Sequence, residues 1–214
     1  FNSYIWVIDA HPEDIAMVDY VKPDGEKVMR TIADFRQLND ALFHAGTDSG
    51  SSCEWEDTPN RLHFYVIDVR RDKDGILSYT LAVRSLDGAG PQRRGVALAS
   101  PGRLNSKLSS TPLVFDLKNT GQAAAADPAL HPSGAAAGGA LDHDVYRLSA
   151  RAEGKGWEVS LPNSLAAVEF GGTAFVTVYA VHAQGSSRSV KITLSATSES
   201  DPSKTASATI ELFR

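Results

Sequence analysis

Apolar and polar residues alternate in five runs of the second half of the chain. Because successive side chains of a strand point to opposite faces, this alternation predicts strands with one buried and one solvent-exposed face. Several such strands at short intervals, separated by turn residues, are typical of a β-sandwich. The runs are Asp144–Ala150, Gly156–Leu161, Thr173–Tyr179, Ser189–Ser195 and Thr205–Glu211.

Two further features extend this prediction. The run Leu113–Gly121 predicts another strand, which ends in a turn at its glycine. Trp157 follows Gly156 within a predicted strand, and we interpret its large apolar ring as the core anchor of the sandwich. Residues 122–141 are mostly Ala, Gly and Pro, which predicts a surface insertion rather than a core element.

The hydrophobic runs of the first half predict fewer elements. Tyr4–Ile8 is continuously apolar, which predicts a strand buried on both faces. Leu62–Asp68 and Leu77–Val83 flank an Asp-Gly turn signal at Gly75 and predict a β-hairpin. Thr31–Phe43 fits a short helix, and a loop followed by a strand remains the alternative.

Gly, Pro and Ser are frequent between residues 86 and 111, which predicts a linker with a domain boundary near residue 105. We therefore divide the chain into residues 1–104 and residues 105–214. The predicted fold class is mainly β: a C-terminal immunoglobulin-like β-sandwich preceded by a smaller α+β or β segment that completes another domain.

Composition excludes several classes of protein. The 214 residues carry a formal net charge of -5, which argues against nucleic-acid binding, and the basic pair Arg93 and Arg94 is predicted to lie in a solvated loop. No apolar run is long enough to cross a bilayer. The single cysteine, Cys53, excludes an internal disulfide and a zinc site built from several cysteines.

The sequence contains no catalytic motif that we can identify. His-Glu-x-x-His, Gly-x-Ser-x-Gly and the phosphate-binding glycine patterns are all missing. Two acidic clusters are candidate metal sites: Asp9 with Glu13 for calcium or zinc, and Asp142 with Asp144 for calcium. Solvated turns are the favoured interpretation of both, because calcium needs six or more oxygen ligands and neither cluster supplies them.

Trp55 lies between two glutamates in a loop-like region and is the candidate for an exposed platform that stacks on a sugar ring. This feature supports an alternative function, in which the chain provides carbohydrate- or cell-wall-binding modules of a secreted glycoside hydrolase. A structural surface protein made of two sandwiches is a third interpretation.

Two resemblances to known families add to this picture. Asn119-Thr-Gly121, Asp144–Leu148, Gly156-Trp157 and Ala196–Ser198 resemble the NEW3-type immunoglobulin-like domain over residues 112–212. The closing segment of immune inhibitor A-like (M6) metallopeptidases is similar to residues 4–83, through Trp6–Glu13, Arg30–Arg36 and Asp40–Phe43.

The resemblances imply that this is the non-catalytic C-terminal chain of a secreted, extracellular bacterial M6-like zinc metallopeptidase. The zinc ligands and the catalytic glutamate would lie upstream, on an N-terminal catalytic polypeptide of the same precursor, and calcium is a further candidate cofactor. The substrate would be a protein or a polysaccharide. Since the chain begins at Phe1 without an initiator Met, we interpret it as a processed piece. We expect Tyr4–Ile8 to join a sheet of that partner polypeptide.

Overall fold

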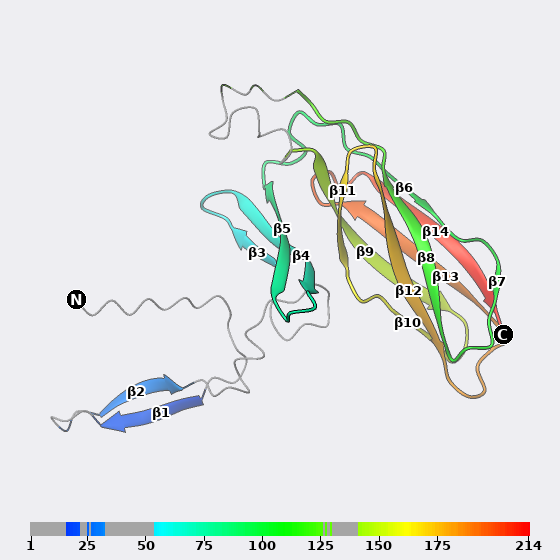
Figure 1. The fold of residues 1–214 in the computed structure, drawn as a ribbon, viewed down its shortest axis with the longest axis horizontal. Helices are drawn as coiled ribbons and strands as arrows, with labels where there is room; N and C mark the ends of the chain where they lie inside the picture. The colour runs from blue at the N-terminus through cyan, green and yellow to red at the C-terminus, as the bar shows by residue number, and fades with distance from the viewer. Residues whose placement is uncertain are drawn as a thin grey trace.

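The computed structural model describes residues 16–21, 25, 27–32, 54–125, 127, 129 and 141–214. Within these residues the regular structure is almost entirely strand, and they contain no α-helix, which confirms a mainly β fold. Figure 1 shows a two-layered sandwich with a small three-stranded sheet beside it.

The sandwich consists of two sheets. The strand order in the first is β10 (Trp157–Ser160), β12 (Thr173–His182), β8 (Ser110–Asn119) and β6 (Val96–Ala99). The order in the second is β11 (Leu165–Glu169), β9 (His143–Glu153), β13 (Ser189–Ser198), β14 (Thr205–Phe213) and β7 (Leu104–Asn105). Neighbouring strands run antiparallel, except that β14 and β7 are parallel.

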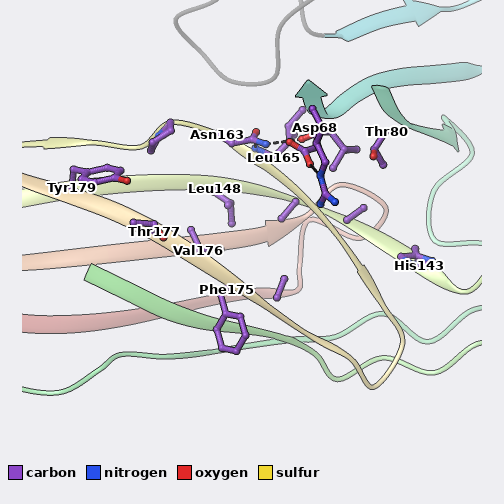
Figure 2. A pocket seen from close by; sticks show the side chains of 16 residues that line it. Asp68, Thr80, His143, Leu148, Asn163, Leu165, Phe175, Val176, Thr177 and Tyr179 are labelled. Carbon is purple, nitrogen blue, oxygen red and sulfur yellow. Dashed lines mark hydrogen bonds and ion pairs between the residues drawn. The ribbon is translucent and has the colours of Figure 1, made fainter. Parts of the chain in front are cut away.

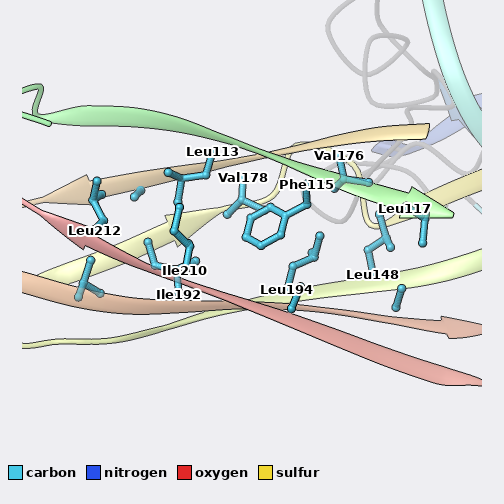
Figure 3. Packing of buried hydrophobic residues seen from close by; sticks show 14 of the residues in the cluster. Leu113, Phe115, Leu117, Leu148, Val176, Val178, Ile192, Leu194, Ile210 and Leu212 are labelled. Atoms are coloured by element: carbon cyan, nitrogen blue, oxygen red, sulfur yellow. The ribbon is translucent and has the colours of Figure 1, made fainter. Parts of the chain in front are cut away.

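Both sheets contribute to one hydrophobic core, shown in Figure 3. Along β8 every second residue is buried, and Leu113, Phe115 and Leu117 are fully inaccessible to solvent. The six runs predicted as sandwich strands all form strands, because their apolar positions share one face and can pack against the other sheet. Trp157 is also buried as predicted, and its indole N–H donates to the Ser187 carbonyl at 3.0 Å.

The turn after β8 joins distant parts of the first and second sheets. Asn119 is fully buried; its side-chain amide donates to the Val168 carbonyl at 2.8 Å and its side-chain oxygen accepts from the Gly121 N–H at 2.9 Å. A Cβ atom at Gly121 would lie 2.4 Å from the Arg93 carbonyl oxygen, so only glycine fits there. The Asn-Thr-Gly sequence therefore fixes the backbone at the end of β8 and connects it to β11 of the other sheet.

The predicted hairpin is confirmed. β4 (Leu62–Arg71) pairs antiparallel with β5 (Leu77–Ser85), and β3 (Glu54–Asp57) adds to the other side of β4. Asp72 stabilises the turn, since its Oδ1 accepts from the backbone N–H groups of Asp74 and Ile76 at 2.9 and 2.8 Å. Gly75 has a φ of 84°, a backbone conformation that glycine adopts without strain.

Other predictions need correction. The segment predicted as a linker contains β6 and β7, both of which belong to the sandwich sheets. β6 is short and surrounded by Gly and Pro, so its pattern was too weak to recognise. β11 was missed because Leu165 and Val168 are separated by two alanines and do not alternate with period two. The domain boundary near residue 105 stays a prediction.

The N-terminal part contains a second hairpin, in which β1 (Ala16–Val21) pairs with β2 (Lys27–Ile32). Thr31 and Ile32 lie in β2, so the helical interpretation is wrong for these two residues, which pair with β1 instead. The rest of that predicted helix, the strand predicted at 4–8 and most of the insertion at 122–141 lie outside the described residues.

Candidate functional site

Charged side chains gather where the three-stranded sheet meets the sandwich. Strand pairing explains part of the grouping, because Glu54 of β3 is opposite Tyr65 of β4, and His63 of β4 is opposite Arg84 of β5. The sandwich supplies Arg147 from β9 and Glu199, which follows the last residue of β13. We call these residues the junction cluster: Glu54, His63, Tyr65, Arg84, Arg147 and Glu199.

Arg147 connects the two parts of the junction cluster. Its two terminal nitrogens donate to the Glu54 carboxylate oxygens at 3.1 and 2.7 Å, and its Nε donates to Glu199 Oε1 at 2.7 Å. Such forked contacts are stronger than single hydrogen bonds and fix orientation. The hydrogen bonds to Glu199 and Glu54 raise the pKa of Arg147, so this guanidinium stays charged.

Tyr65 lies at the centre of the junction cluster. Its hydroxyl donates to Glu199 Oε2 at 2.9 Å and accepts from Arg84 Nε at 2.6 Å. Burial raises the pKa of Tyr65, so the phenol remains neutral. Burial also acts to raise the pKa of Glu199, but the hydrogen bonds from Arg147 and Tyr65 outweigh it and lower the pKa below its ordinary value.

His63 is buried within the junction cluster, with 7% of its side chain exposed. Its ring stacks on Tyr65 at 4.1 Å, and its Nδ1 lies 2.9 Å from the Tyr65 hydroxyl. Its Nε2 lies 2.9 Å from Glu54 Oε2 but is not aligned for a hydrogen bond to any group. A metal ion could be held by three of these residues, because one ligand atom from each lies within 4.8 Å of the other two: Glu54, His63 and Glu199.

A buried ion pair lies at the start of β9. Arg94 contacts Asp144 Oδ1 at 3.0 Å, and the side chains are 10% and 0% exposed. Asp144 also accepts from the Ser198 hydroxyl at 2.7 Å and from the Val145 N–H at 3.0 Å. The prediction that Arg94 lies in a solvated loop is therefore wrong, because its partner Asp144 is buried and draws the guanidinium inward.

The predicted site residues are not brought together with the junction cluster. Asp144 has the partners just described, and Asp142 contacts the ring of its neighbour His143. Trp55 lies in β3 opposite Phe64, and its side chain is outside the described residues, as are Asp9 and Glu13. Their roles in calcium or sugar binding stay predictions. The junction cluster was missed because Glu54 and Arg147 are separated by 93 positions in the sequence.

A cavity of about 530 Å³ lies between the three-stranded sheet and the sandwich (Figure 2). Asp68 and Thr80 line it on one side, and Leu165, Val176 and Phe175 line it on the other. The lining is mixed in polarity. Among its described side chains no hydrogen-bonded nucleophile–base pair is found, so the cavity by itself does not indicate catalysis.

Comparison with known families identifies the chain. A family model described as a peptidase M6-like domain matches residues 99–214, more than half of the sequence. The chain belongs to the peptidase M6-like family. A second model, described as a middle domain, matches residues 1–86 of this M6-like protein. The M6-like description thus falls on the sandwich half, whereas we had traced the resemblance to residues 4–83.

One curated relative of the M6-like chain comes from Arthroderma benhamiae (strain ATCC MYA-4681 / CBS 112371) and is named "Putative secreted metallopeptidase". It is 48% identical over 215 residues, a region that covers 97% of this chain and 31% of the relative. The chain therefore spans about a third of the relative's length. No helix among the described residues is both long and apolar enough to cross a membrane.

Solved structures resemble the chain only distantly. The C. elegans MSP family member WR4 is 10% identical, with a TM-score of 0.30, and the alignment covers 53% of this chain and 92% of WR4. The N-terminal domain of PorA is 12% identical with the same score of 0.30, covering 55% of this chain and 96% of that domain. Scores at this level carry no conclusion about function.

Proposed function

We propose that this chain is the non-catalytic, C-terminal part of a secreted M6-like zinc metallopeptidase and that it supports a catalytic region located upstream. One observation carries the proposal: the chain belongs to the M6-like family but contains no His-Glu-x-x-His sequence. That motif places two zinc ligands and a general base on one helix face. Without it, the chemistry needs residues from elsewhere in the precursor.

The junction cluster is a poor candidate for the peptidase centre itself. A catalytic zinc needs an open coordination position for the water that attacks the substrate. In the cluster, the guanidinium of Arg147 occupies the space between the two carboxylates and hydrogen-bonds to both. As long as Arg147 stays in this place, its charge disfavours a metal-bound hydroxide, and its contact with Glu54 holds the three-stranded sheet to the sandwich.

The location and the accessory domain type belong to the same proposal. The word "secreted" in the relative's name supports an extracellular location for this chain. The two-sheet sandwich and the buried Trp157 are compatible with the NEW3-type immunoglobulin-like domain that the sequence resembles. Zinc in the upstream region is expected from the metallopeptidase relationship, and that region would be the partner of this chain.

The test uses the full-length Arthroderma benhamiae relative, because this chain corresponds to only 31% of its length. We expect the purified protein to cleave casein in a zinc-dependent manner, and we expect the 214-residue chain alone to be inactive at every zinc concentration. Deleting the region that corresponds to this chain should reduce the yield of folded, secreted enzyme. Zinc-dependent cleavage by the isolated chain would overturn the proposal, most directly if His63→Ala abolished that activity.

A further inference from the structure

We propose that Glu54, His63 and Glu199 form a binding site for a transition-metal ion of the zinc class, located where β3 and β4 meet the end of β13. The bound ion would join the three-stranded sheet to the sandwich through its ligands. This inference rests on the geometry of the cluster and does not depend on the proposed peptidase function.

The first argument is the composition of the group. One imidazole nitrogen and two carboxylates, with ligand atoms within 4.8 Å of one another, come from three separate segments of the chain. Zinc accepts such a mixed nitrogen and oxygen set at about 2.0–2.2 Å. Calcium and magnesium require mainly oxygen ligands, so the imidazole of His63 selects against them.

The second argument is the unpartnered nitrogen of His63. The phenol of Tyr65 has one proton, which it donates to Glu199, and its oxygen accepts from Arg84. The contact between Tyr65 Oη and His63 Nδ1 is therefore satisfied when Nδ1 carries the ring proton. In the neutral ring, Nε2 then presents a lone pair to Glu54 Oε2 at 2.9 Å, with no hydrogen bond. Two lone pairs this close repel each other, and either a proton on Nε2 or a metal ion shared by the two groups relieves the repulsion; the absence of an aligned hydrogen bond favours the metal ion.

This arrangement of His63 matches a common feature of metal sites. Histidine ligands usually use one ring nitrogen for the metal and donate the other N–H to a nearby acceptor, which fixes the orientation of the ring. Here Tyr65 provides that acceptor and stacks on the ring. With a side chain that is 7% exposed, His63 has little freedom to turn toward water instead.

Arg147 competes with the metal ion in this proposal. Its guanidinium pairs with both Glu54 and Glu199, but its side chain is 40% exposed and can move outward into solvent. A divalent ion would take over the neutralisation of both carboxylates. Removing the positive charge of Arg147 should therefore leave metal binding intact or tighten it, whereas a purely structural ion-pair cluster predicts no metal binding in any variant.

The experiment titrates the 214-residue chain with Co²⁺ and follows the visible absorption that reports nitrogen and oxygen coordination. We expect one saturable ion per chain, displaced by Zn²⁺. His63→Ala should raise the Kd for Co²⁺ by at least about tenfold, and so should a second ligand variant, Glu199→Gln. Arg147→Gln should bind as tightly as the unmodified chain or more tightly.

His182→Ala is the matched control, because its Nε2 is also buried without a hydrogen-bond partner but its ring faces Trp157 rather than carboxylates. It should leave the titration unchanged. Circular dichroism of each variant checks that the fold is retained. The proposal is overturned if the unmodified chain does not bind, if His63→Ala binds equally well, or if Arg147→Gln loses binding as His63→Ala does.

Discussion

Replacing Arg94 with methionine should destabilise the sandwich strongly, because it leaves the charge of Asp144 buried without its partner. At 3.0 Å and an effective dielectric constant of about 20, the attraction between the two charges is about 5.5 kcal/mol. The Asp144 side chain is 0% exposed, so water cannot replace the guanidinium. The hydrogen bonds from Ser198 and Val145 remain and reduce the loss. We expect Arg94→Met to lower the free energy of unfolding by about 3–5 kcal/mol.

Urea denaturation followed by far-UV circular dichroism measures this loss. The matched control is Arg61→Met, which removes a surface pair with Asp87 whose side chains are 61% and 62% exposed, and it should cost less than about 1 kcal/mol. Adding Asp144→Asn to Arg94→Met should restore part of the stability, since the buried group is then neutral. A loss below about 1 kcal/mol for Arg94→Met, or one no larger than the control, would refute the reasoning.

Three further predictions concern other parts of the molecule. Phe115→Ala should lower the free energy of unfolding by about 3–5 kcal/mol, measured by thermal or urea denaturation, because the ring is fully buried. The control Phe175→Ala, at a side chain that is 75% exposed, should lower it by less than about 0.5 kcal/mol. Burial, and then the charge of Asp144, raise the pKa of Tyr146 in the folded protein. As pH rises above about 10, the Tyr146 hydroxyl therefore loses its proton in the unfolded chain at a lower pH than in the folded one. Stability should therefore fall above that pH, and Tyr146→Phe should make the fall shallower when unfolding is compared at about pH 9 and pH 11. Asn163 donates to the Ile67 carbonyl at 2.6 Å, so Asn163→Ala should speed limited proteolysis of the three-stranded sheet; an unchanged cleavage rate would show that this contact does not hold the sheet.

The sequence was sufficient where a strand has one buried face. Leu113, Phe115 and Leu117 alternate strictly, so β8 and its inward side could be predicted from residues alone. β11 could not, because its alanines give no alternation and its place depends on pairing with β9. The same limit applies to the candidate site, since Glu54 of β3 and Arg147 of β9 are 93 positions apart and meet only in the tertiary structure.

The environment of Arg94 could not be predicted either, because its partner Asp144 belongs to β9. An arginine among glycines is usually solvated, and only the buried carboxylate of Asp144, 50 positions further along the numbering, draws it inward. Sequence patterns report the face on which a residue lies. They do not report which residue from a distant segment will lie opposite.

The buried amide of Asn119 has a consequence for the order of events during synthesis. Its partner carbonyl belongs to Val168, and the strand that flanks β8 on one side, β12, ends at His182. After Asn119, the ribosome therefore has to add more than sixty further residues before both the Asn119 amide and the β12-facing edge of β8 can form their hydrogen bonds. Until then the nascent chain holds an unfinished sheet, and contacts this distant in sequence make the closing step slow.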